Sequence, residues 1–295
     1  MPAMKRLRLV VLLAVALASL GVASPARAGL LDSLLGGSSG ETGSAEGGGA
    51  ERACQPLAVP GLPLGLGGCP GVHPGSLIQT DNGACTLNFL FAGADGDRYI
   101  GTAGHCVLAT SPVGQNNGEE VFDEGEGPEA RGSDGERIGE FAYAIQEVPK
   151  DFALIRLDPD VEVSPQVPQF GGPTGVNDEI TRGTSPVVLN NFGNSLGIGG
   201  PLANGKSFVA LGLPDRDVVA ATGLALPGDS GGPVLDEQGR AVGVLVNVGP
   251  QLSDTLLSLE NADFGLIGIT RITPQVERAE DVLGTDLTLQ TAPRL

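Results

Sequence analysis

Short runs of apolar residues, separated by glycine, proline, asparagine and aspartate, recur along most of the chain after residue 71. Runs of this length between turn-forming residues are typical of β-strands. They fall into two groups on either side of the segment 165–173 (PQVPQFGGP), which predicts two all-β halves. A proline at a first helical position and a glycine after the last predict one short helix at 273–284. The apolar runs lie at 85–93, 98–103, 138–145, 152–157, 185–190, 207–213, 218–222, 241–248 and 264–272.

The amino-terminal end has a different pattern. Three basic residues among the first eight precede an apolar run over 9–22 and the sequence Ala-Arg-Ala at 26–28. The run is shorter than the roughly 20 residues that cross a bilayer as a helix, and a cleavage pattern of small residues follows it. We therefore predict that residues 1–28 are a signal peptide and that the mature protein is secreted, without a membrane anchor.

The glycine-rich segment 36–50 (GGSSGETGSAEGGGA) has almost no hydrophobic side chains and is typical of a flexible linker. Residues 51–70 contain two cysteines but little periodicity, which indicates a small lead-in held by a disulfide. The predicted parts are thus the signal peptide, the linker with its lead-in, one β-domain and a tail, at 1–28, 29–70, 71–284 and 285–295.

Charge restricts the classes of partner. Removal of residues 1–28 leaves 13 basic and 35 acidic residues, a formal charge of −22. Nucleic acids and anionic membranes are bound by neutralising their negative charge with lysine and arginine. We therefore expect no nucleic-acid partner and no membrane partner after signal cleavage, and we expect a monomer.

Four cysteines in an exported chain predict two disulfides, with three possible connectivities. Cys54 and Cys69 flank a segment rich in glycine, proline and leucine. Cys85 and Cys106 lie in two apolar runs that could pair as neighbouring strands. These positions favour pairing Cys54 with Cys69 and Cys85 with Cys106.

The acidic segment 117–140 raises the alternative of a calcium site, because clustered carboxylates bind this ion. The segment lacks the ligand spacing of an EF-hand loop, and runs of charge are usually solvated. We interpret it as a solvated loop, and we predict neither a metal ion nor a cofactor for this protein.

The sequence LPGDSGGPV at 226–234 makes Ser230 either a turn residue or a nucleophile. A serine hydroxyl becomes nucleophilic when a base removes its proton, and the chain has two histidines. His73 lies in PGVHPG, which predicts a surface turn. His105 follows an apolar run in TAGHC and is the candidate base.

An imidazole that acts as a base needs a carboxylate to hold its tautomer and to stabilise its positive charge. Among the aspartates between His105 and Ser230, only Asp151 immediately precedes a fully apolar run, FALI, so it would enter the interior at the mouth of a strand. The backbone N–H groups of Gly228 and Ser230 are the expected oxyanion hole, because glycine lets the backbone converge on one point. Asp229 would repel an oxyanion, so its carboxylate is expected to turn inward to a partner.

Three blocks, TAGHC, DFALIRL and GDSGGP, resemble in order and spacing the catalytic blocks of the chymotrypsin-like (trypsin-fold) serine peptidases. The segment GACTLNF is similar to the secreted bacterial branch, of which the streptogrisins and α-lytic protease are examples. The resemblance covers roughly residues 75–272 and is specific only at the blocks. It implies two six-stranded antiparallel β-barrels with an active site between them, and endopeptidase activity on polypeptide substrates.

Transferred block by block, the resemblance implies that His105 is the general base, Asp151 its orienting acid and Ser230 the nucleophile. It also implies that Cys85 and Cys106 form the family's disulfide beside the catalytic histidine. Activity should then rise as His105 loses its proton, with a midpoint near or somewhat above about 6.5.

The primary specificity pocket departs from the family pattern. The position six before the serine, which often forms the pocket floor, is Leu224, and the usual Ser-x-Gly of the substrate-pairing strand reads Val246-Asn247-Val248. The second half also contains no cysteine, so disulfides usual near the pocket are missing. Leu224, Val246 and Val248 predict a pocket for small or modest apolar side chains before the scissile bond.

Two other functions fit the same residues. A catalytically silent binding module could keep the fold, because one fold serves many functions. An esterase of small acyl groups would use the same three side chains. The activation route also stays open, since either the segment 29–70 serves in it or the domain folds directly in its active form.

Overall fold

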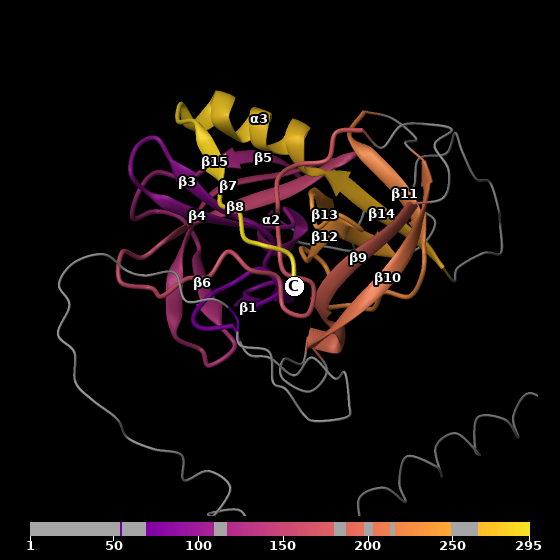
Figure 1. Ribbon diagram of the computed structural model, residues 1–295. Coiled ribbons are helices and arrows are strands. Elements are labelled where there is room, and N and C mark those ends of the chain that lie inside the picture. Colours follow the sequence, from indigo (N-terminus) through magenta and orange to yellow (C-terminus); the bar gives the residue numbers. More distant parts are fainter. Residues whose placement is uncertain are drawn as a thin grey trace, which may run out of the picture. The chain divides into compact units, whose positions relative to one another are not determined.

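The computed structural model describes residues 54, 69–108, 117–179, 187–197, 203–212, 216–248 and 265–295. The predicted signal peptide and linker lie outside these residues. Within them, no helix is long and apolar enough to cross a membrane. The strands form two sheets, one from each predicted half of the chain, and the C-terminal tail adds a strand to the first (Figure 1).

The first half, together with one strand from the C-terminal tail, forms an antiparallel sheet of nine strands. Its strands are β1 (Leu77–Thr80), β2 (Gly83–Thr86), β3 (Leu90–Gly93), β4 (Arg98–Thr102), β5 (Gly118–Val121), β6 (Glu129–Gly132), β7 (Arg137–Glu147), β8 (Lys150–Leu157) and β15 (Leu287–Leu289). The strand order is β15-β3-β4-β8-β7-β6-β1-β2, and β5 pairs with β7. The one-turn helix α2 (His105–Leu108) follows β4.

The second half closes into a six-stranded barrel. Its strands are β9 (Val187–Asn194), β10 (Ala203–Gly212), β11 (Val218–Thr222), β12 (Pro233–Asp236), β13 (Ala241–Val248) and β14 (Leu266–Arg271). Around the barrel the order is β10-β11-β14-β13-β12-β9, with neighbours antiparallel throughout. A 3-10 turn, η1 (Ser195–Gly197), follows β9.

The longest strand of the first sheet is covered on both faces. β7 reads RIGEFAYAIQE, and every residue between its two ends is buried. Nine consecutive buried residues leave neither face of the strand to solvent, and the polar Glu140 and Gln146 are buried along with the apolar residues. The hydrophobic cluster around β7 also includes Phe192, Val244 and Val246 of the barrel. The two halves are therefore joined by a shared core.

The predicted C-terminal helix is confirmed as α3 (Ile272–Leu283), which packs against β8 of the sheet and β13 and β14 of the barrel (Figure 1). It ends at Gly284, whose φ of 68° is the left-handed conformation that glycine adopts at helix ends. The tail then adds a strand that the apolar pattern did not predict. Leu287 pairs with Gly93 and Leu289 with Phe91, so β15 covers the edge of β3.

The predicted all-β fold with a short C-terminal helix is confirmed. The closed barrel matches the expected six strands, but in the described residues the first half is an open sheet with more strands than expected. Four strands of this sheet, β1, β5, β6 and β15, lie outside the predicted apolar runs, and each has only three or four residues.

Both predicted disulfides are confirmed, Cys54 with Cys69 and Cys85 with Cys106. Cys54 is buried, and its backbone N–H donates to the Gln166 side chain at 2.7 Å. Cys54 is therefore attached to the segment that connects the sheet to the barrel.

Two leucines of the C-terminal tail test how much the added strand contributes to stability. Leu287 is 7% exposed in β15, whereas Leu295 is 56% exposed at the chain end. Leu287→Ala should lower the free energy of unfolding by about 2 to 4 kcal/mol, because it leaves a cavity in the core. Leu295→Ala should change it by less than about 0.5 kcal/mol. Urea denaturation of both variants measures the difference, and equal losses would show that β15 does not anchor the tail.

Candidate active site

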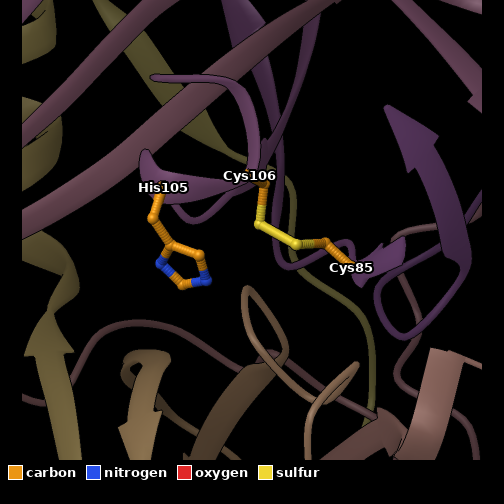
Figure 2. A group of neighbouring side chains, drawn as sticks. All are labelled: Cys85, His105 and Cys106. Atoms are coloured by element: carbon orange, nitrogen blue, oxygen red, sulfur yellow. A yellow bond between two sulfur atoms is a disulfide. The ribbon is translucent and has the colours of Figure 1, made fainter. Parts of the chain in front are cut away.

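His105 stands at the start of α2, where the chain leaves β4. A Cβ at Gly104 would overlap the carbonyl oxygen of Ile145 in β7, so only glycine permits this approach to the sheet. The approach leaves His105 6% exposed. Figure 2 shows His105 and Cys106 together on α2, with the disulfide to Cys85 joining this helix to β2. The TAGHC block thus fixes the histidine between two strands.

Asp151, at the start of β8, holds His105 with both carboxylate oxygens. The Nδ1 atom of the imidazole lies 2.8 Å from Oδ2 of Asp151, and the backbone N–H of His105 donates to Oδ1 at 2.9 Å. A carboxylate only accepts here, so the ring carries its proton on Nδ1 and leaves Nε2 free to accept one. This is the orientation that a general base requires.

Burial and the charge of Asp151 shift the pKa of His105 in opposite directions. Burial disfavours the charged imidazolium and lowers its pKa, but the charge of Asp151 and its hydrogen bond raise it by more. The net result is a pKa above the ordinary 6.5. His73, half-buried in the turn before β1, shows the reverse. Its burial outweighs the hydrogen bond to the Pro74 carbonyl, so its pKa is lowered.

Ser230 lies in a turn just before β12 and is half-buried. Its carbonyl oxygen accepts a hydrogen bond at 2.8 Å from the N–H of Thr86 in β2. The Asn88 side chain donates to the carbonyl of Gly231 at 3.0 Å. The turn is therefore tied to the first sheet, through the strand to which the disulfide also attaches the His105 helix.

Two features of the backbone of this turn bear on the predicted oxyanion hole. Gly228 has φ of 96°, and a Cβ there would overlap the backbone of Asn194 and Gly197. In the described part of the chain, the N–H groups of Gly228 and Ser230 have no hydrogen-bond acceptor. Two unpaired donors two residues apart in a tight turn are the components of an oxyanion hole.

Asp229 turns inward, as the sequence predicts, and the structure identifies its partner. Its carboxylate is completely buried and accepts from Lys206 Nζ at 2.7 Å. Ser195 Oγ at 3.2 Å and the N–H of Leu226 at 2.8 Å complete its contacts. Loss of one partner from such a buried pair costs about 3–5 kcal/mol, because the other charge stays buried.

The predicted pocket residues lie in different surroundings. Leu224 is 67% exposed, between β11 and the Ser230 turn. Val246 is buried in the shared core, and the side chain of Val248 lies outside the described residues. The pocket for small apolar side chains stays a prediction.

One cluster, Cys85, His105 and Cys106, has the atoms of a metal site within reach of one another (Figure 2). The two sulfurs form a disulfide, and Nδ1 of His105 is hydrogen-bonded to Asp151. The cluster therefore lacks the thiolates that a metal ion needs. Among the described residues, the acidic segment 117–140 contributes no group of three ligands close enough to hold an ion.

The closed barrel beside a curled sheet, with a histidine–aspartate pair and a serine turn at their junction, defines a chymotrypsin-like fold. A family model, the trypsin-like peptidase domain, matches residues 89–244, more than half of the chain. The protein belongs to this family. His105, Asp151 and Ser230 all lie within the matched region.

Several solved structures are similar to this chain at low sequence identity. A glutamic acid specific serine protease is 16% identical over 74% of this chain and 100% of its own, with a TM-score of 0.43. A Nocardiopsis protease gives the same identity and coverage and a TM-score of 0.42. A Yersinia pestis serine endoprotease is 12% identical over 72% of this chain and 63% of its own, at 0.44. A comparison with curated proteins found no match.

Sequence reasoning did not find three polar residues that contact the Ser230 turn, namely Thr86, Ser195 and Lys206. One signal was available for Lys206, because it is one of only two lysines after the predicted signal peptide. With so few lysines in the chain, Lys206 was a candidate partner for the inward-turned carboxylate of Asp229. The two other residues are common polar types with no local pattern.

The titration of the two histidines tests the electrostatics of the site. In the wild type, NMR titration should give a His105 midpoint above 6.5 and a His73 midpoint below it. Asp151→Asn removes the charge that raises the pKa of His105 and leaves the burial that lowers it, so this midpoint should fall below 6.5. His73 serves as the internal control and should not move. A His105 midpoint that is unchanged in Asp151→Asn would contradict the assigned role of Asp151.

Proposed function

We propose that this protein is a secreted serine endopeptidase in which Ser230, His105 and Asp151 form the catalytic triad. The observation that carries the proposal is the His105–Asp151 pair, in which Nδ1 of the imidazole is hydrogen-bonded to Oδ2 of Asp151 at 2.8 Å and Nε2 is left free. The protein that holds this pair belongs to the trypsin-like peptidase family. The attachment of the Ser230 turn to β2 supports placing the nucleophile beside that free nitrogen.

In the proposed reaction, Ser230 Oγ attacks the carbonyl carbon of a peptide bond while His105 Nε2 takes the hydroxyl proton. The carbonyl oxygen becomes an oxyanion and accepts hydrogen bonds from the N–H groups of Gly228 and Ser230. Collapse of this intermediate breaks the C–N bond, and His105 gives its proton to the leaving amine. Water then attacks the acyl-enzyme by the same route and releases the carboxylic acid and free Ser230.

Asp151 stabilises the imidazolium that forms in both halves of the cycle. Its position already favours that cation, because the pKa of His105 is raised despite burial. The side chain accepts from Nδ1 throughout and does not itself take the proton.

The substrate preference follows from the residues around the turn. Leu224 offers no carboxylate to a basic side chain, so we infer a preference for small or modest apolar residues before the scissile bond. The strongly acidic mature chain favours polypeptides over nucleic acids or anionic membranes as partners. We further propose export by cleavage after residue 28 and action as an extracellular monomer.

A fluorophosphonate probe tests the proposed nucleophile. Ser230 Oγ should displace fluoride from phosphorus and give one stoichiometric adduct, measured as intact mass of the exported protein. Ser230→Ala should give none and should lower peptide hydrolysis by at least about a thousandfold. Ser207→Ala, which removes an exposed hydroxyl from the barrel, should label like the wild type.

The same measurement discriminates the alternatives. A folded wild-type protein that forms no adduct would be either an uncleaved, latent precursor or the catalytically silent binding module on this fold. An adduct together with hydrolysis of acyl esters, but not of any peptide in a library, would be the esterase.

A further inference from the structure

A groove with a volume of about 320 Å³ opens on the first sheet. Its walls come from residues 71–72, from β1 with the residue before it, from Leu87 after β2, from the turn between β6 and β7, and from residues 161–162. None of the residues that line it belongs to the candidate triad or to the Ser230 turn. Its volume lies at the lower end of the range of ligand-binding pockets, so it suits a side chain or a short segment of a partner.

The more buried residues of the lining form an apolar floor. Leu87 and Ile138 belong to the buried core of the first sheet, and Val72 and Val161 pack against that core while remaining partly exposed. An apolar side chain that covers such a floor removes it from water. The methylene groups of a lysine or an arginine do the same, because these side chains bury their stems and keep the charged end in solvent.

Acidic side chains line the edge of the groove. Asp134 and Glu136 are exposed in the turn between β6 and β7, and Glu162 is exposed on the wall formed by residues 161–162. The turn is fixed by its own hydrogen bonds. The N–H of Glu136 donates to Oδ1 of Asp134 at 3.0 Å, and the N–H of Gly132 donates to the Glu136 carbonyl at 2.9 Å. The Asp134 carboxylate is thus ordered before a ligand arrives, which lowers the cost of binding one.

The two arginines nearest in sequence to these carboxylates are paired with other groups. The Arg137 guanidinium donates to both carboxylate oxygens of Asp158, at 3.1 and 3.2 Å, and Arg131 forms an ion pair with Glu129. In the part of the chain that the structure describes, no cation pairs with either carboxylate of the turn. The edge therefore keeps its negative charge, and the predicted mature chain is itself strongly acidic. Such a site is complementary to a cationic partner.

The groove and the candidate active site share a segment of the chain. Leu87 follows Thr86, whose N–H donates to the carbonyl of Ser230 at 2.8 Å, and the N–H of Leu87 itself donates to the carbonyl of Ser76 in the groove lining at 2.8 Å. A polypeptide held in the groove can therefore present a neighbouring part of its chain to the Ser230 turn. Holding it there raises its effective concentration at that turn.

We propose that this groove is an exosite, a second binding site for the polypeptide substrate apart from the scissile bond. It takes a segment in which arginine or lysine stands next to apolar residues. The apolar side chains and the methylene groups cover the floor, and the cationic end pairs with Asp134 and Glu136. Binding follows from the groove alone, whereas the role of the bound polypeptide as a substrate rests on the proposed function.

Fluorescence anisotropy of a dye-labelled Leu-Arg-Leu-Arg-Leu peptide tests the binding. The protein is the full exported chain with Ser230→Ala, so the probe is not cleaved. In this background, Asp134→Asn with Glu136→Gln removes both charges and keeps the oxygen that accepts from the N–H of residue 136. The dissociation constant should rise at least about fivefold, the scale of two exposed ion pairs.

A matched double variant controls for the overall charge of the protein. Asp123→Asn with Glu124→Gln removes the same charge from two exposed side chains that do not line the groove. It should change the dissociation constant by less than about twofold, because salt screens charges that do not contact the ligand. Two further peptides separate the two parts of the site. Leu-Gln-Leu-Gln-Leu lacks the cation and Ala-Arg-Ala-Arg-Ala lacks the apolar residues, so each should bind at least about fivefold more weakly than the probe.

Three binding results would overturn the proposal. The first is equal affinity of the probe for the Asp134→Asn/Glu136→Gln protein and its parent. The second is equal affinity of the parent for the arginine and glutamine peptides. The third is binding that is absent, or that appears only after Arg52→Gln. Arg52 is the one basic residue of the segment 29–68, and in the latter case it would be the occupant of the groove.

Kinetics of the chain with Ser230 intact connect the groove to the activity. A peptide substrate extended by Leu-Arg-Leu-Arg-Leu should have a lower KM than its short form. Asp134→Asn with Glu136→Gln should raise the KM of the extended substrate only and leave kcat unchanged. Equal KM values for the two substrates would show that the groove is not an exosite. A protein that hydrolyses no peptide at all defeats the proposed function, and the anisotropy measurements still decide whether the groove binds basic polypeptides.

Discussion

The candidate site depends on a contact between two backbones that leaves no space for a side chain. At Gly231 the φ of 88° suits only glycine, and a Cβ would overlap both the Thr86 carbonyl oxygen and the Thr102 hydroxyl. The turn that carries Ser230 therefore rests directly on β2 and β4. The helix with His105 leaves the same β4 and is bonded to the same β2. The turn with Ser230 and the helix with His105 are therefore attached to the same two strands, β2 and β4.

Polar side chains are buried along this contact, and each of them makes hydrogen bonds. Thr86, Thr102 and Asp229 are each completely buried, and each bonds to main-chain or side-chain partners at its neighbours. A buried group that loses its partner cannot turn to water, so alternative arrangements of the turn are costly. Apolar packing joins the two halves, but these directional bonds select the single arrangement in which the backbone donors of the turn are free.

The parts of the fold and site that are encoded locally could be predicted from sequence. Apolar runs between turn residues gave most strands, and the blocks around His105, Asp151 and Ser230 gave candidate chemistry through their order and spacing. The parts that depend on distant contacts could not. β5 and β15 are strands because a neighbour offers them an edge, and Lys206 meets Asp229 only once β10 and the turn are assembled. The directions of individual N–H groups could not be predicted for the same reason, since they follow from tertiary hydrogen bonds.

The pairing of Asp229 with Lys206 bears on when this protein becomes competent. Among the residues that the structure describes, every group that hydrogen-bonds to the buried carboxylate comes from the barrel, from the 3-10 turn after β9 or from the turn itself. In this part of the chain, Lys206 balances the charge of the carboxylate, so folding of the barrel is enough to neutralise the buried end of the turn.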